Sequence, residues 1–543
     1  MLDDYPVLTL LPPILAITLA ITTRKVLISL GLGVVSAALL VADASPLGTL
    51  EELATAFGQI FWVEGALNTT YVYILVFTLA LGVITAFVSM SGGTRAFGDW
   101  ALQRIRTRRG ATALPAALGG AIFVDDYFNA LTVGQVSRPI TDRHRVSRAK
   151  LTYLVDSTSA PVAVLMPFSS WGAYILGIFA TVLADSTLEV SDLGAYVRAA
   201  AANYYAQAAL LLVVLVVALR VDLGPMRSEE RRALEEGETF DKGEDIPGQL
   251  SEDLPVHRPG AKRSLVVPFL VLVLGVLVGI VWTGWRSSGS LAVLDVLAEA
   301  DVTLSLLVGA APALLAAIYY YARDTTSNPK FSRSTFGRGW IEGLKSMWPA
   351  VSILLLAWML GSLIDSLGTG EYLGGLVEDS SLSASWLVPT VFLVAGAMAF
   401  ATGTSWGSFG LLLPIAGGIV NSLDAPELLL PTLGAVLAGA VAGDHASPIS
   451  DTTILSSTGA GCNVITHVTT QLPYVVLAVV AAVAGYVALA LTGSTALGAL
   501  VTALAGGLLI LGARSAFPPL DPPGRGHPSG PPEGAEDVPT LQA

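Results

Sequence analysis

The chain has 543 residues, of which 53% are hydrophobic and only 13% charged, and its mean hydropathy is +0.67. These values lie well above those of ordinary soluble domains, so the sequence predicts a membrane protein. The net charge of −13 argues against nucleic-acid binding, which needs a concentrated basic surface. The single cysteine excludes an internal disulfide and any site built from several thiolates.

Apolar runs of about 20 residues, long enough to cross a hydrocarbon core roughly 30 Å thick, recur along the chain. The first run has none of the features of a removable signal, so we expect it to be the first span. With four further interrupted runs, we predict an all-α polytopic membrane protein of about 11–13 transmembrane helices. The continuous runs cover residues 6–22, 26–42, 70–90, 195–219, 264–282, 302–321, 348–367, 471–491 and 496–511.

The loops alternate between basic and acidic composition. Arginine and lysine concentrate in residues 95–109, 138–150 and 323–345, whereas residues 43–52 and 295–301 are acidic. Because basic loops remain on the cytoplasmic side, we expect a multi-pass protein of the cell membrane with its basic loops in the cytoplasm.

This alternation conflicts with a simple crossing at residues 111–134. Basic loops flank this stretch on both sides, although it is only one helix long. Either the second basic loop breaks the rule, or the stretch enters and leaves the same face as a re-entrant element, which we favour. Acidic loops flank two short apolar runs that meet at "ATGTSWGSFG" (401–410), a mirror-image case. Opposed elements of this kind predict inverted repeats with discontinuous or re-entrant helices.

Short fragments also echo between the two halves. "FSSWGAY" (168–174) is similar to "GTSWGSF" (403–409), and "DSTSAP" (156–161) is similar to "DHASPI" (444–449), but the order of the fragments differs. We expect six parts, with a solvated cytoplasmic linker between the halves and a disordered tail. They are N-terminal membrane helices (1–69), a first transporter half (70–220), the linker (221–263), a second half (264–491), a C-terminal membrane helix (492–513) and the tail (514–543).

Two adjacent carboxylates interrupt the apolar stretch "GGAIFVDDYFNALTVG". One aspartate near the bilayer centre costs about 2.5 to 3.5 kcal/mol on insertion scales, so Asp125 and Asp126 need partners or a function there. Asn129 follows at helical spacing and brings an amide near them. The alternative is a loop at the membrane surface with ordinary solvated acids.

A second cluster lies in "VDSTSAPVAVLMPFSSWG". Asp156, Ser157 and Thr158 are followed by Pro161 and Pro167, and prolines release backbone carbonyls that can line an ion site. The alternative is that the hydroxyls bond to their own helix.

Two further clusters lie in the second half of the chain. Thr404 and Ser405 are surrounded by glycines, which favours an unwound hinge, with a simple turn as the alternative. The densest cluster is "GDHASPISDTT", where a stripe of small residues precedes a proline interruption. For its two aspartates a purely structural role is the alternative, and its histidine is either a hydrogen-bond partner or a titrating group. Its candidate residues are Asp444, His445, Ser447, Asp451 and Thr452.

Carboxylates, hydroxyls and carbonyls are hard ligands that suit a hard cation, and Na⁺ is the natural candidate. Because burial raises the pKa of carboxylic acids in general, protons compete with the cation for one site, and exchange follows without a covalent step or a resident cofactor. The predicted Na⁺ ligands are Asp126, Asn129, Asp156, Ser157, Thr158, Thr404, Ser405, Asp444, Ser447, Asp451 and Thr452. The residues predicted to couple protons are Asp125, Asp126, Asp156, Asp444, His445 and Asp451.

Three stretches resemble the NhaC-type sodium/proton antiporters of the wider ion-transporter superfamily. They are "DDYFNALTVG", "DSTSAPVA" through "PFSSWGAY", and "ATGTSWG" with "GDHASPISDTTILSS". The resemblance implies an inner-membrane protein, not an enzyme, that expels Na⁺ in exchange for protons, in some members together with an organic acid such as malate or lactate. Li⁺ transport and a passive cation channel are the remaining alternatives, and the sequence does not define the oligomeric state.

Overall fold

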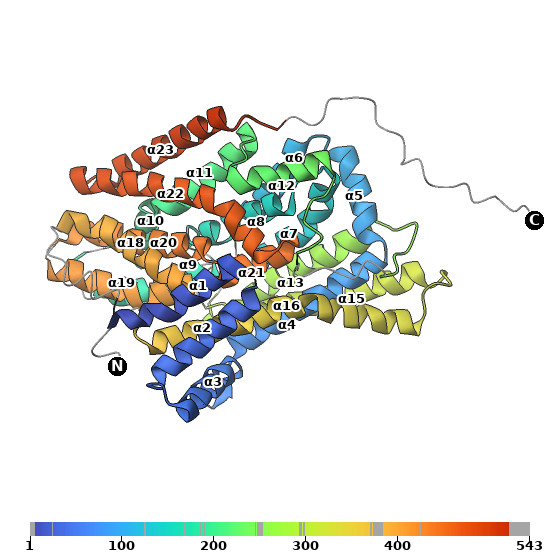
Figure 1. The fold of residues 1–543 in the computed structure, drawn as a ribbon, viewed down its shortest axis with the longest axis horizontal. Coiled ribbons are helices and arrows are strands. Elements are labelled where there is room, and N and C mark those ends of the chain that lie inside the picture. The colour runs from blue at the N-terminus through green and yellow to red at the C-terminus, as the bar shows by residue number, and fades with distance from the viewer. Residues whose placement is uncertain are drawn as a thin grey trace, which may run out of the picture.

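The chain folds almost entirely into helices (Figure 1). The computed structural model describes residues 6–520 except 24, 64, 124–125, 168, 185, 189, 245, 247–253, 291, 293–295, 297–298, 370–371, 373–383 and 424. In this part of the chain the strands are β1 (Trp62–Val63) and β2 (Ala66–Leu67), which pair antiparallel. The predicted all-α class is therefore confirmed. The predicted tail lies mostly beyond the described residues.

The continuous apolar runs all fall on helices. Nine helices in the described ranges are long and apolar enough to cross a membrane, and two shorter apolar helices begin the chain. Run 195–219 is divided in two because Asn203 accepts the backbone N–H of Ala206 at 3.1 Å and starts a new helix. These outer and linking elements are η1 (Pro6–Leu10), α1 (Leu11–Thr23), α2 (Val26–Val41), α3 (Pro46–Phe61), α4 (Thr69–Met90), α5 (Gly93–Arg104), α10 (Asp192–Ala201), α11 (Tyr204–Leu219), α12 (Gly224–Glu235), α13 (Arg263–Ser288), α15 (Val302–Thr325), α16 (Arg333–Ser366), η2 (Pro426–Leu428), α22 (Val464–Thr492) and α23 (Thr495–Ala516).

The segment with the topological conflict is a helical hairpin. Helix α6 (Arg108–Ala121) packs against α7 (Asp126–Arg143), and the tip lies between them. The open ends meet, because Arg108 Nε donates to the carbonyl of Arg145 at 3.3 Å. His144 Nε2 also lies 2.8 Å from the carbonyl of Ile105. The chain therefore returns to the end from which it came, as the re-entrant alternative predicts.

The same unit occurs twice along the chain: a helical hairpin followed by an interrupted helix. In the first half, the hairpin α6–α7 precedes α8 (Arg148–Ala163) and α9 (Ser170–Ala184). In the second half, α18 (Ala384–Thr402) and α19 (Ser405–Ser422) form the hairpin and precede α20 (Leu429–Ala446) and α21 (Asp451–Ala460). Gly403, with a φ of 72°, occupies the second tip, where the left-handed backbone reverses the chain without a steric penalty.

The two interrupted helices run in opposite directions. Arg148, the first residue of α8, donates to the carbonyl of Gly461, directly after α21, at 3.2 Å. At the other end of the molecule, Val182 near the end of α9 packs against Gly417 of α19, close to where the chain turns into α20. The repeated units are therefore inverted relative to each other, as inverted-repeat transporters are.

The order of helices in the two repeated units shows which pair of similar sequence fragments corresponds to the repeat. "DSTSAP" and "DHASPI" both lie where an interrupted helix breaks, so they occupy equivalent positions. The first Ser-Trp-Gly fragment starts α9, which follows the break in the interrupted helix, whereas the second starts α19, which follows the tip of a hairpin. Their similarity is therefore not a repeat equivalence, and this is why the fragments could not be aligned in order.

Glycines let α18 and α20 cross closely, as the small-residue stripe predicts. A Cβ atom added to Gly443 would lie 2.0 Å from the carbonyl oxygen of Gly396, and one added to Gly439 would lie 2.1 Å from that of Phe392. Helix backbones approach this closely only where side chains are absent.

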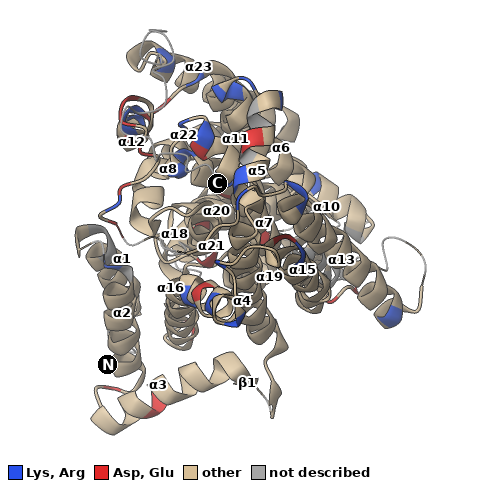
Figure 2. Ribbon diagram, turned by 90° about the vertical axis from the view of Figure 1, so that its right-hand side faces the viewer, with Lys and Arg blue, Asp and Glu red and all other residues tan. Residues whose placement is uncertain are grey.

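Basic residues spread over one end of the molecule, seen face-on in Figure 2. We call this end the basic face, and it includes Arg108, Arg145 and Arg148. We call the opposite end, which includes Asp301 and Asp365, the acidic face.

The described part of the linker differs from the expected solvated chain. Helix α12 packs against the basic face, and Glu230 is 1% exposed. Its carboxylate accepts from the guanidinium of Arg108 and, at 2.7 Å, from the backbone N–H of Ser147. The apolar positions Met226 and Ala233 are fully buried, so a charged sequence hides an amphipathic helix here.

We predict that Gly443→Ala destabilises the protein. The added methyl group would overlap the carbonyl of Gly396, so we expect a cost of about 1–3 kcal/mol. The measurement is the thermal unfolding midpoint of the purified protein in detergent. Gly507→Ala on α23 is the matched control, because a Cβ there meets no atom within 4 Å. Equal midpoints for the two variants would contradict the close crossing.

Candidate functional site

The hairpin tips meet the breaks of the interrupted helices in the middle of the molecule. Asp126, the first residue of α7, is 2% exposed and accepts from the indole N–H of Trp171 at 2.8 Å. At the second tip, a Cβ on Gly403 would lie 2.7 Å from the carbonyl of Ile449, between α20 and α21. The rings of Trp171 and Trp406 pack edge to face at 5.8 Å. Both predicted tips therefore lie in one central region.

Two of the predicted aspartates begin parallel helices. Asp126 starts α7 and Asp451 starts α21, and the hydroxyl of Tyr127 donates to the carboxylate of Asp451. Eight residues further along each helix, Gly134 packs directly against Gly459. The two N-termini therefore lie at the same level, where the helix dipoles stabilise negative charge.

A cavity of about 860 Å³ leads to these two carboxylates. Asp126, Asp451 and Thr404 lie in its wall, and it extends to the exposed residues Asp301 and Asp365 of the acidic face. Asp126 is 2% exposed, so the surface-loop alternative does not hold for it, and Asp451 is 6% exposed. These carboxylate and hydroxyl oxygens are ligands that a hard cation prefers.

Asp444 lies behind this wall, beside the second hairpin tip. It is 1% exposed, and its Oδ2 accepts from the hydroxyl of Ser405 at 2.8 Å. Its other oxygen, Oδ1, is buried and has no donor in good hydrogen-bond geometry among the described residues, and Ser450 lies near the carboxylate. Burying a carboxylate oxygen without a hydrogen bond costs free energy unless a cation or a proton binds to it.

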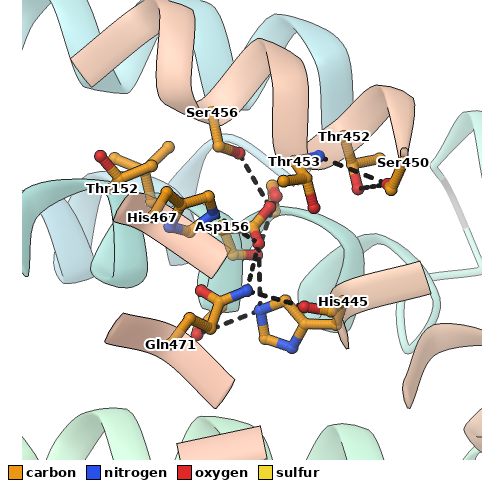
Figure 3. Close-up of polar contacts among 12 residues, drawn as sticks. Thr152, Asp156, His445, Ser450, Thr452, Thr453, Ser456, His467 and Gln471 are labelled. Carbon is orange, nitrogen blue, oxygen red and sulfur yellow. Dashed lines mark hydrogen bonds and ion pairs between the residues drawn. The ribbon is translucent and has the colours of Figure 1, made fainter. Parts of the chain in front are cut away.

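Asp156 is surrounded instead by protein donors, as Figure 3 shows. Its Oδ1 accepts from Ser456 at 2.8 Å, and its Oδ2 accepts from Gln471 at 2.7 Å. Nε2 of His467 lies 3.2 Å from this oxygen, and Nε2 of His445 lies 3.3 Å from it. A carboxylate has about four lone-pair sites, so these contacts leave little room for a cation.

His445 joins this cluster to two more helices. Its Nδ1 lies 2.7 Å from the hydroxyl of Tyr205, and its Nε2 lies 3.2 Å from the hydroxyl of Ser157. The carbonyl of His445 accepts from Gln471 at 2.9 Å. Ser157, Asp156 and His445 are therefore brought together, but as one packed polar network away from the cavity wall.

Asn129 and Thr158 support the first hairpin. The Asn129 amide donates to the carbonyls of Gly119 at 2.7 Å, Ile122 at 2.8 Å and Thr158 at 3.3 Å. The hydroxyl of Thr158 donates to the carbonyl of Leu154 at 2.7 Å, so it bonds to its own helix, as the structural alternative states. Both side chains satisfy backbone groups that the break in the chain exposes.

Two further predicted ligands also make internal contacts. Ser447 donates to the carbonyl of Phe400 at 2.9 Å, and the hydroxyl of Thr452 lies 2.9 Å from that of Ser450. Asp125 lies outside the described residues. No group of three or more His, Cys, Asp or Glu side chains that could hold a metal ion occurs within the described ranges.

Sequence reasoning missed several partners of the buried acids. His467 and Gln471 are spaced by four residues on α22, an otherwise apolar helix, and this spacing places them on one face. Two polar residues at this spacing could have signalled a buried contact. Nothing local distinguishes Ser456 and Trp171 as partners of the acids, or Tyr205 as the partner of His445, because these contacts form only through the tertiary fold.

The structure contains two opposed hairpins and two interrupted helices, which bring acids together in the interior. This arrangement defines a secondary ion-transporter architecture. Residues 162–491 match the Na⁺/H⁺ antiporter family. The chain is also 41% identical over 502 residues to an uncharacterized protein of Haemophilus influenzae, covering 91% of this chain and 93% of that one. The chain therefore belongs to the Na⁺/H⁺ antiporter family.

Two other relatives match shorter stretches. An uncharacterized Na⁺/H⁺ antiporter of Haemophilus influenzae is 34% identical over 129 residues, which cover 23% of this chain and 26% of that protein. A malate-2H⁺/Na⁺-lactate antiporter of Bacillus subtilis is 32% identical over 158 residues, which cover 27% of this chain and 32% of that protein.

We predict that Asn129 and Thr158 respond differently to loss of their polar groups. Asn129→Leu leaves the carbonyls of Gly119 and Ile122 without their donor, at a cost of about 1–3 kcal/mol for each group. Thr158→Val preserves the shape and removes only a bond within its own helix, so we expect less than about 1.5 kcal/mol. Thermal unfolding in detergent measures both, and a larger loss for Thr158→Val would contradict these roles.

Proposed function

We propose that the protein exchanges Na⁺ for H⁺ across the cell membrane through its buried carboxylates. The observation that carries this proposal is the cavity that leads from the acidic face to Asp126 and Asp451. Family membership supports cation/proton antiport in general. The coupling of the two ions at these residues is our proposal.

In this proposal the cation binds where the hairpin tips meet α21. Asp126, Asp451 and Thr404 lie in the cavity wall, and Asp444 with Ser405 lies directly behind the second tip. The two negative charges at the cavity end attract one cation or protons, and the helix dipoles favour the charged carboxylates in their absence. Binding of one species therefore displaces the other, which is exchange at a shared site.

The Asp156 network would serve coupling rather than direct cation binding. It joins α8 of the first half to α21 and α22 of the second half through Ser456 and His467. Ser456 lies on the same short helix as Asp451, so a shift of α21 at the cavity is transmitted to this network. We retain Asp156 and His445 as proposed proton-coupling residues on this basis.

The cavity opens to one end of the molecule, which agrees with an alternating-access cycle. The cavity reaches the acidic face, whereas ion pairs cover the basic face, including Arg108 with Glu230 and Arg148 with Asp142 at 3.3 Å. Because positive charge stays on the cytoplasmic side, we propose that the basic face is cytoplasmic and that this conformation is open to the outside.

Coupling to an organic acid is less well supported. The relative from Bacillus subtilis is named for malate and lactate, which are anions. The described wall of the cavity contains four aspartates and no Lys, Arg or His, so it offers no cation to pair with a carboxylate substrate.

We predict that Asp126→Asn or Asp451→Asn reduces exchange to the level of protein-free liposomes, because each removes a charge from the end of the cavity. Asp156→Asn and Asp444→Asn are expected to abolish exchange or to shift its pH dependence. The measurement is Na⁺-dependent collapse of a pH gradient in proteoliposomes. Glu51→Gln on the exposed surface of α3 is the matched control and should exchange normally.

Two results would contradict this function. Wild-type Na⁺ flux that follows its gradient without proton movement would identify a passive channel. Normal exchange in both Asp126→Asn and Asp451→Asn would remove these residues from the ion site.

A further inference from the structure

The cavity is far larger than a sodium ion needs. Its volume of about 860 Å³ could hold on the order of 30 water molecules at their liquid volume. Pockets that bind small organic molecules have about 300–1,000 Å³. The volume therefore fits a solute of several carbon atoms.

The charge of the wall selects against anions. Asp126 and Asp451 lie at the buried end, and Asp301 and Asp365 lie toward the exposed end. The described residues of the wall include no basic side chain. A cleft lined by one sign of charge concentrates solutes of the opposite sign, so an organic solute here would be a cation.

An aromatic wall lies between the two charged ends. Tyr71 of α4 stacks on Trp358 of α16, with ring centroids 4.2 Å apart and an angle of 13° between the planes. Aromatic faces bind organic ammonium groups through cation–π attraction and pack against carbon chains. A bare Na⁺ gains little from such a wall, because it prefers oxygen ligands.

Trp358 also lies next to the buried end of the cavity. Its side chain is 8% exposed and lies beside the carboxylate of Asp451. The aromatic wall therefore adjoins the carboxylates to which an ammonium group would bind.

We propose that the cavity binds small alkylammonium compounds, so that an organic cation competes with Na⁺ for the site. For the role of Asp126 and Asp451 this inference rests on the proposed function. The ammonium group pairs with these two carboxylates, and the carbon chain lies along Tyr71 and Trp358. Asp365 follows Trp358 by seven residues on α16, about 10 Å at the helical rise, and receives a second polar end group.

The test uses four probes with the same four-carbon chain and different end groups: 1,4-diaminobutane, 4-aminobutan-1-ol, butane-1,4-diol and succinate. Each is added to wild-type protein in proteoliposomes during Na⁺-driven proton exchange. We expect the two ammonium compounds to inhibit in competition with Na⁺ and to raise the thermal unfolding midpoint. The diol and succinate should do neither.

The aromatic wall is tested with Trp358→Leu. We expect the inhibition constant of 1,4-diaminobutane to rise roughly three- to tenfold more than the KM for Na⁺, because only the organic cation uses the ring. Trp348→Leu is the matched control, since Trp348 lies on the same helix, is 61% exposed and does not line the cavity. Equal changes in the two constants for Trp358→Leu would overturn the aromatic contact.

The outcomes separate this inference from the proposed function. If wild-type protein exchanges Na⁺ for H⁺ but no ammonium probe inhibits or stabilises it, the inference is wrong and the proposed function stands. If succinate or the diol acts as strongly as the diamine, the inference is also wrong. If the ammonium probes stabilise a protein that shows no Na⁺-dependent proton movement, the proposed function fails and the binding inference stands.

Discussion

A broken helix inside a membrane exposes backbone groups that water cannot reach, and the whole centre of this protein is organised to satisfy them. Asn129 donates to the carbonyls that α6 leaves at its end. Ser169 donates to the carbonyls of Ala163 and Met166 at 2.7 and 2.8 Å where α8 stops. Ser447 does the same for Phe400 at the second hairpin. Small polar side chains therefore stabilise three of the chain interruptions in the interior of the protein.

Once the interruptions are supported, the buried acids fall into two environments. Asp156 receives protein donors from α21 and α22, so its charge is balanced within the fold. Asp126 and Asp451 lie where the cavity ends; Asp126 accepts from the indole of Trp171, and Asp451 accepts from the hydroxyl of Tyr127. The sequence clusters look alike, but of these three acids only Asp126 and Asp451 line the cavity.

Much of the fold could be predicted from local patterns. Apolar runs located the long helices, and the charges on both sides of residues 111–134 were enough to predict the first hairpin, because a helix cannot cross a membrane and remain on one side. Local patterns could not predict which of the buried acids line the cavity and which are bonded within the protein. Asp156 meets His467 and Gln471, more than 300 residues later, only after α8 packs against α22. Thr158 and Asn129 have the composition of ligands, yet their hydrogen bonds go to the backbone. The amphipathic character of α12 was hidden by its many charges.

The position of Glu230 has a consequence for how the basic face could separate. One carboxylate is shared between Arg108, at the entrance of the first hairpin, and Ser147, directly before the first interrupted helix. Glu230 belongs to the segment that connects the two halves of the chain. This segment therefore also holds neighbouring elements of the basic face together. Any rearrangement that pulls these elements apart must detach Glu230 from one of them and also break the direct contact of Arg108 with the carbonyl of Arg145.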